Sequence, residues 1–273
     1  MRNQRERGIA FCALHERETA FIIPNPWDIG TARLLAHLGF EALATTSAGY
    51  AFSIGQRDNT VGRDRMMAHV REIVATTDLP VSADLENGFG DDPETVAETI
   101  ALAAAAGLVG ASIEDSTTRR DDPIYELDHA AERVRAAAEV VRALDFPFML
   151  TARAENFLFG RNSLDDTIKR LQAYHDAGAN VLYAPGLANK DDISAVVSSL
   201  DRPVNVLMGL AGVRLSLAEL SEIGVKRISV GSVLSRVALG AFLRAAQEMQ
   251  DRGTFTFGEN AVSFRDLSKM FER

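Results

Sequence analysis

Residues 81–115 read VSADLENGFG DDPETVAETI ALAAAAGLVG ASIED. The first five residues form a short apolar run typical of a buried strand, and residues 93–106 place apolar side chains at helical spacing. Gly107 follows, as expected where a helix ends in a left-handed conformation, and a second apolar run occupies 110–115. The stretch therefore predicts a strand–helix–strand unit, whose two strands lie parallel in one sheet.

The same unit repeats along the chain. Glycine again separates a helical pattern from the next apolar run at 38–40, 177–179 and 223–225. Eight strands, each followed by a helix, predict an α/β fold of the (β/α)₈ TIM-barrel type, with a doubly wound open sheet as the alternative. The expected strands are Phe21–Trp27, Ala42–Ser47, Val81–Leu85, Gly110–Asp115, Phe148–Ala154, Asn180–Pro185, Val204–Gly209 and Arg227–Gly231. The expected helices include Ile29–Leu38, Asp64–Thr76, Pro93–Ala106, Leu127–Leu144, Leu164–Ala177, Ile193–Leu200 and Leu217–Ile223.

Two terminal segments fall outside the eight units. Asn3–Glu16 and Phe264–Arg273 are each expected to form a helix that covers a barrel end or packs on a neighbouring subunit. No Gly/Ser linker, charge block or low-complexity tract divides the chain, so we expect one domain over 1–273.

Composition narrows the possible functions. Net charge is −9 and no basic stripe is present, which disfavours nucleic-acid binding. No apolar run approaches the roughly 20 residues that cross a bilayer, and no signal-peptide core follows the N-terminus, so we expect a cytoplasmic protein without a membrane partner. Cys12 is the only cysteine, which excludes an intrachain disulfide and a cysteine-based metal site.

Acidic residues stand at the carboxyl ends of two neighbouring strands. Asp84 and Glu86 share one face after the third strand, and Glu114 ends the fourth. Carboxylates this close repel one another unless a cation neutralises them, and oxygen ligands suit Mg²⁺, with Mn²⁺ as a substitute. We predict a metal site at Asp84, Glu86 and Glu114. Asp92 and Asp115 are instead expected to face solvent or cap a helix.

Further polar residues occupy the same rim. Arg153, in the face of the fifth strand that holds Thr151, could grip a substrate carboxylate, or it could serve only in a structural ion pair. Small residues at 47–49 could offer backbone N–H groups to an anion, although an ordinary turn has the same composition. We expect an inward Asn205 to orient a substrate oxygen or to be a core amide, and Trp27 to wall the pocket or anchor the core. His15, His37, His69 and His175 are expected at the surface.

These motifs together resemble the isocitrate lyase/phosphoenolpyruvate mutase superfamily. The resemblance rests on Asn25–Asp28, Thr45–Gly49, Arg57-Asp58, Ala83–Gly90, Ile113–Asp115 and Thr151–Arg153, and it extends from strand one through strand eight.

The resemblance implies a barrel whose last helix, about residues 260–273, is swapped with a neighbour, usually in a dimer of dimers. It implies Mg²⁺ held by Asp84 with support from Glu86 and Glu114. Ser47, Ala48 and Gly49 would then bind a substrate carboxylate through their amides. Catalysis would involve Asp58 near the metal waters, Glu114, and Arg153 on the substrate oxygens.

One loop departs from the family pattern. Cleavers of isocitrate-like acids carry a Lys-Lys-Cys-Gly-His loop after strand four, and phosphonate mutases a Lys-Thr-Asn-Ser type, whereas this chain reads STTRRDDP at 116–123. The pattern therefore resembles members that decarboxylate or otherwise cleave oxaloacetate-like acids. It predicts a Mg²⁺-dependent carbon–carbon lyase that acts on a small 2-oxo acid, or a 2-oxo or 2-hydroxy diacid, through a pyruvate-enolate-like intermediate. A P–C bond hydrolase or phosphonomutase and a non-catalytic 2-oxo-acid binding protein are the alternatives, and residues 116–123 are expected to act as a lid.

Overall fold

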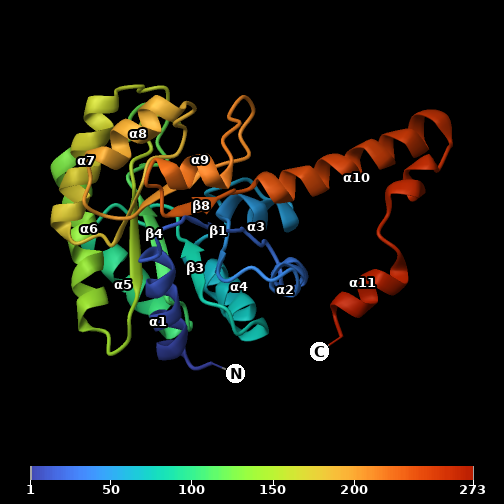
Figure 1. Ribbon diagram of the computed structural model, residues 1–273, viewed down its shortest axis with the longest axis horizontal. Helices are drawn as coiled ribbons and strands as arrows, with labels where there is room; N and C mark the ends of the chain where they lie inside the picture. The colour runs from blue at the N-terminus through green and yellow to red at the C-terminus, as the bar shows by residue number, and fades with distance from the viewer. Residues whose placement is uncertain (1, 273) are drawn as a thin grey trace.

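The computed structural model describes residues 2–272 and confirms the predicted (β/α)₈ barrel (Figure 1). Eight parallel strands follow one another in the order β1-β8-β7-β6-β5-β4-β3-β2. They are β1 (Phe21–Ile23), β2 (Leu43–Ala44), β3 (Val81–Asp84), β4 (Gly110–Glu114), β5 (Met149–Arg153), β6 (Val181–Tyr183), β7 (Val204–Leu207) and β8 (Arg227–Ser229).

Every strand lies where the sequence predicts it, and each ends earlier than expected. Pro24 and Pro26 shorten β1, because proline has no N–H to donate to a neighbouring strand. The polar rim residues after the strands are thereby released from the sheet ladder and are free to face the barrel mouth.

The barrel closes between β1 and β2 through backbone and amide contacts. The Ala44 N–H donates to the Pro24 carbonyl at 3.1 Å, and the Asn25 side-chain amide donates to the Thr45 carbonyl at 3.1 Å. The Asn25 amide oxygen also accepts from the N–H groups of Val230 and Gly231, each at 2.9 Å. One side chain thus joins three segments at the rim.

Helices surround the sheet. α1 (Gln4–His15) lies across the amino ends of the strands, where Phe11 packs on Gly110 and Met149. The helices between strands are α2 (Ile29–His37), α4 (Arg63–Thr76), α5 (Pro93–Ala105), α6 (Leu127–Ala143), α7 (Leu164–Ala177), α8 (Lys190–Ser198) and α9 (Leu217–Glu222). The seven expected helices and the N-terminal one are therefore present.

One helix was not expected, and another is the helix predicted to follow the eighth strand. α3 (Ser47–Ser53) begins directly after β2, with the Thr46 hydroxyl accepting from the Gly49 N–H at 3.2 Å as its N-cap. α10 (Val233–Arg252) follows β8 and projects from the barrel as a long helix (Figure 1).

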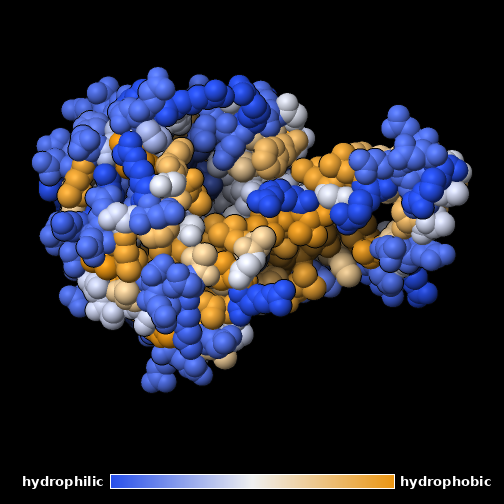
Figure 2. Space-filling view, turned by 90° about the horizontal axis from the view of Figure 1, so that it is seen from above, coloured by the Kyte–Doolittle hydropathy of each residue, from blue (hydrophilic) through white to orange (hydrophobic). Residues whose placement is uncertain are grey.

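α10 and the segment after it, which contains η1 (Thr256–Asn260) and α11 (Phe264–Met270), together form an arm. α11 falls within the predicted terminal helix, whose last residue, Arg273, lies outside the described residues. Figure 2 shows apolar surface along this arm and on the adjoining barrel. The exposed apolar side chains of the arm include Val237, Phe242, Leu243, Phe255, Val262 and Phe264.

Three residues expected at the surface are buried. His15 and His69 are each 4% exposed, because α1 covers the barrel floor and α3 packs against α4. Asp115 is 2% exposed and accepts hydrogen bonds from Tyr174 and Arg170 of α7, so it ties the end of β4 to a helix. None of the described helices is long and apolar enough to span a membrane.

Candidate active site

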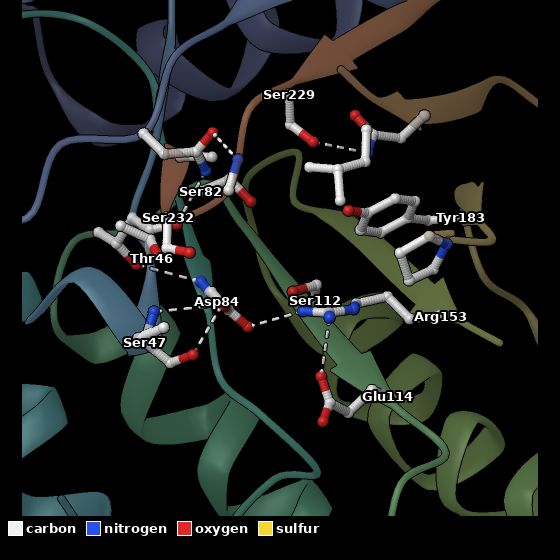
Figure 3. Close-up of a pocket in the computed structure, with 18 of the residues that line it drawn as sticks. Thr46, Ser47, Ser82, Asp84, Ser112, Glu114, Arg153, Tyr183, Ser229 and Ser232 are labelled. Carbon is white, nitrogen blue, oxygen red and sulfur yellow. Dashed lines mark hydrogen bonds and ion pairs between the residues drawn. The ribbon is translucent and has the colours of Figure 1, made fainter. Parts of the chain in front are cut away.

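A cavity of about 220 Å³ opens at the carboxyl ends of the strands, where barrel enzymes hold their active sites (Figure 3). Asp84 of β3, Glu114 of β4 and Arg153 of β5 meet there, as the sequence predicts. The cavity wall also includes Asn25, Thr46, Ser47, Ala48, Asp58, Ser82, Ser112, Glu155, Leu158, Tyr183, Pro185, Asn205, Leu207, Arg227, Ser229 and Ser232.

Arg153 lies at the centre of the carboxylates. Its guanidinium contacts Asp84 at 2.9 Å, Glu114 at 3.1 Å and Glu155 at 2.8 Å, with the arginine side chain 13% exposed. Burial alone would lower the pKa of Arg153, but the surrounding carboxylates raise it well above its ordinary value. This arginine is therefore a fixed positive charge that partly neutralises the acidic rim.

Carboxyl groups outnumber the Arg153 guanidinium at the rim, and their burial and crowding raise their pKa values, so they hold protons that a cation could replace. Burial raises the pKa of Glu86 to about 8, with further increases from Asp84, Asp58 and Glu114. Asp58 stands on an exposed loop, yet its carboxyl faces the cavity beside Ser47, and loss of hydration followed by the charge of Asp84 raises its pKa. The charges of the site therefore favour the binding of one more cation.

The donor set fits a hard divalent ion. Glu86 is 6% exposed, and its Oε1 has no hydrogen-bond partner although its neighbours are acidic. Among residues 2–272, no three His, Cys, Asp or Glu side chains are placed to hold one ion together, so Asp84, Glu86 and Glu114 do not form a joint set of direct ligands. Mg²⁺ keeps several waters and needs only one or two direct carboxylates. Asp84 would hold the ion, with Glu86 and Glu114 as supporting groups.

The amides predicted to bind a carboxylate are mostly engaged within the protein. The Ser47 N–H and hydroxyl donate to Asp84 Oδ2 at 3.1 and 2.9 Å, and the Gly49 N–H donates to Thr46. Ser47 and Ala48 line the cavity, whereas Gly49 and Trp27 pack behind the wall against each other. The first turn of α3 therefore positions Asp84 and leaves Ala48 as the amide best placed for a ligand.

Asn205 points into the barrel but its amide is engaged on both sides. Its oxygen accepts from Arg227 Nε at 2.9 Å, and its nitrogen donates to Ser229 Oγ at 3.0 Å. Arg227, Ser229 and Tyr183 also line the cavity and were missed from the sequence. Arg227 and Ser229 share the inward parity of β8, which could have found them.

Internal contacts hold the loop after β4 against the end of that strand. Ser116 donates to Glu114 Oε1 at 2.6 Å, and an antiparallel bridge joins Ser116 to Ile124. Arg119 forms an ion pair with Asp91 at 2.7 Å. The loop thus reaches the site through Ser116, and its action as a lid stays a prediction.

The fold and the rim define a barrel enzyme with an acidic, arginine-centred site, and comparison with known proteins gives its family. Residues 11–250 match the phosphoenolpyruvate phosphomutase family. The crystal structure of a lyase/mutase-type protein from Burkholderia cenocepacia J2315 is 63% identical, with a TM-score of 0.96 over 99% of this chain and 97% of that one. Uncharacterized protein Rv1998c of Mycobacterium tuberculosis (strain ATCC 25618 / H37Rv) is 30% identical over 89% of this chain and 90% of its own. Oxaloacetate acetylhydrolase in complex with the product oxalate is 25% identical, with a TM-score of 0.85 over 97% of this chain and 93% of that one.

The chain therefore belongs to the isocitrate lyase/phosphoenolpyruvate mutase superfamily, as its motifs predicted. It is an enzyme of the lyase type, in a superfamily of carbon–carbon lyases that act on small acids.

Proposed function

We propose that this enzyme is a Mg²⁺-dependent lyase that cleaves the bond beside C3 of a small 2-oxo acid and leaves an enolate. The observation that carries the proposal is the convergence of Asp84, Glu114 and Arg153 in one cavity. Glu86 does not line that cavity, but it is buried within reach of the charges of Asp84 and Glu114, and its Oε1 is unpartnered. The acids supply oxygen ligands for the ion, and the arginine supplies a fixed positive charge for a developing oxyanion.

Mg²⁺, when bound, would polarise the 2-oxo group of the substrate as a Lewis acid. The chain's own residues would perform the remaining tasks. Arg153 stabilises the oxyanion, the Ala48 amide orients a carboxylate, and Asp58 contacts the water around the ion. The cavity of about 220 Å³ suits a short acid or diacid rather than a long-chain one.

A carbon–carbon bond is favoured over a carbon–phosphorus bond by the charge at the rim. A phosphonate carries more negative charge than a carboxylate, and Arg153 is already paired with three carboxylates. Loss of CO₂ from an oxaloacetate-like dianion instead leaves the total charge unchanged, and it moves one negative charge onto the enolate oxygen that Arg153 would stabilise. The solved oxaloacetate acetylhydrolase supports the same substrate class, since that relative acts on a four-carbon 2-oxo diacid.

We further propose that residues 1–273 form one domain that assembles as a homo-oligomer, a dimer of dimers, through its arm. The apolar side chains of the arm, such as Phe242 at 67% and Phe264 at 89% exposure, support a protein contact there. A second copy of the chain, exchanging its α10–α11 segment, is the occupant we propose.

A paired assay tests the proposed reaction. Oxaloacetate and phosphonopyruvate are incubated separately with Mg²⁺, and release of CO₂ and of phosphate is measured. We expect CO₂ from oxaloacetate and its loss in Asp84→Asn, while the control Asp92→Asn, an exposed residue with no capping bond, keeps activity. Phosphate release would establish the P–C alternative, and Mg²⁺-dependent oxalate binding without turnover of either acid would indicate a binding protein.

A further inference from the structure

Tyr183 presents its hydroxyl to the cavity from the end of β6. The residue is 8% exposed, lines the cavity, and has the Arg153 guanidinium carbon 5.2 Å from its ring centroid. Figure 3 shows the phenol oxygen pointing inward, on the same side of the site as Ser229. The ring is therefore held beside the group that would stabilise the enolate.

A chain of hydrogen bonds leads from the barrel interior to this hydroxyl. Arg227 Nε donates to Asn205 Oδ1 at 2.9 Å, and Asn205 Nδ2 donates to Ser229 Oγ at 3.0 Å. The Ser229 hydroxyl in turn acts on the Tyr183 hydroxyl, whose pKa it lowers. Arg227 is 5% exposed and also donates to Thr151 Oγ1 at 3.0 Å, so the inner end of the chain is fixed.

The chemistry of Arg227 sets the direction of this chain. A guanidinium has only donors, so the Asn205 oxygen must accept and its nitrogen must donate onward. Ser229 accepts at its oxygen and has its single proton left to donate to the Tyr183 oxygen. The phenolic proton of Tyr183 then has no place in the chain and is directed to the cavity.

We propose that Tyr183 is the catalytic proton donor of this site and delivers its proton to C3 of the enolate. The inference rests on the proposed lyase function. In this step the enolate carbon–carbon double bond supplies the electron pair for the new C3–H bond, while the Tyr183 O–H bond breaks. The phenolate that remains accepts hydrogen bonds from Ser229 and recovers a proton from water at the cavity mouth.

Three further observations agree with this role. The loop after β4, residues 116–123, contains neither cysteine nor histidine, so it offers no thiol or imidazole acid. Burial raises the pKa of Tyr183 to about 12, with the charge of Arg153 acting in the opposite direction, so the hydroxyl keeps its proton at neutral pH. Ser47 cannot take the role readily, because its hydroxyl donates to Asp84.

The test follows where the proton goes. 3-Methyloxaloacetate is decarboxylated in D₂O with Mg²⁺, and the 2-oxobutanoate formed is reduced at once so that the configuration of its CHD carbon can be determined. In parallel, exchange of the C3 protons of pyruvate with D₂O is followed by NMR. The variants are Tyr183→Phe, Ser229→Ala, which keeps the phenol but removes its donor, and the control Tyr125→Phe, whose hydroxyl contacts Asp91 outside the cavity.

We expect wild type and Tyr125→Phe to deliver deuterium to one face of C3. Tyr183→Phe should give racemic CHD and exchange pyruvate at least about 10²-fold more slowly, the usual contribution of a general acid. It should still bind oxalate with Mg²⁺, which shows that its site is intact. Ser229→Ala should keep the stereochemistry and slow the exchange less.

Stereospecific deuteration and undiminished exchange by Tyr183→Phe would overturn the role of Tyr183 while leaving the lyase function standing. Racemic product from the wild type would also overturn it, because no protein group would then deliver the proton. A wild type that neither cleaves the acid nor exchanges pyruvate would refute the proposed function, and the inference with it.

Discussion

Removal of the Arg153 charge tests whether this guanidinium stabilises the carboxylates of the site. In Arg153→Met, the carboxylates of Asp84, Glu114 and Glu155 lose their contacts at 2.9, 3.1 and 2.8 Å to the same guanidinium. Breaking one buried ion pair costs about 3–5 kcal/mol. The three contacts share one cation and are not additive, so we expect a total loss of about 3–5 kcal/mol at pH 7.

Thermal and urea unfolding of Arg153→Met and wild type provide the measurement. At about 2–4 °C per kcal/mol for a chain somewhat shorter than this one, the expected fall in Tm is roughly 6–20 °C. The difference from wild type should shrink at pH 5, because Glu114, whose pKa is raised by burial, then takes up a proton and no longer needs a partner. Added Mg²⁺ should stabilise the variant, since an ion that binds only the folded state adds about 2.7 kcal/mol at a hundred times its Kd.

A loss below about 1 kcal/mol at pH 7 would contradict this reasoning, because the carboxylates would then be adequately solvated without Arg153. A loss that is the same at pH 5 and pH 7 would also contradict it. Arg153→Lys is the matched variant, because it retains the positive charge but cannot contact all three carboxylates at once. Its stability should lie between that of wild type and that of Arg153→Met.

Three further predictions concern residues around the site and beneath it. Burial lowers the pKa of His15 to about 3, whereas in the unfolded chain this histidine takes up a proton below about pH 6.5. The free energy of unfolding should therefore fall by about 2 kcal/mol between pH 7 and pH 5. In urea unfolding, His15→Gln should remove that part of the pH dependence. Asp115→Asn should cost about 3–5 kcal/mol, measured as a lower urea midpoint, because it leaves the Arg170 charge at 3.0 Å without its buried partner. In Gly49→Ala the new Cβ would lie 2.5 Å from Thr46 Cγ2, and this clash would displace the first turn of α3. We expect the KM to rise about tenfold, with little change in stability. An unchanged KM would show that this turn does not orient the substrate.

The barrel and the centre of the site follow from local sequence. The expected rim residues Asp84, Glu114 and Arg153 each stand at the end of an apolar strand, and in a parallel barrel all such ends meet on one side. Because side-chain parity fixes which of them point inward, the three could be placed together without any long-range information. Their roles in binding and catalysis stay predictions.

The remaining features depend on contacts between distant segments. Nothing near Arg227 reveals that its partners are Asn205 and Thr151, since they come from other strands across the barrel. His15 carries a helical pattern typical of a surface residue, and it is buried only because its ring packs against Phe21 under the barrel.

α3 escaped prediction for a different reason. The segment SAGYAFS at 47–53 is short and consists mainly of small residues, and the N-cap of its helix is Thr46. The engagement of Ser47 with Asp84 follows from that turn. A sequence pattern indicated free amides here, whereas the folded chain uses two of the three.

Oxalate binding reports on the proposed metal site without any turnover, because oxalate has the charge and the shape of a pyruvate enolate. Its affinity would be measured by calorimetry for wild type and Asp84→Asn, each with Mg²⁺ and with a chelator. We expect wild type to bind oxalate at least a hundredfold more tightly with Mg²⁺ than with the chelator, and Asp84→Asn to lose that difference. Equal binding with and without the ion, or an Asp84→Asn variant that keeps the full Mg²⁺ effect, would contradict the account.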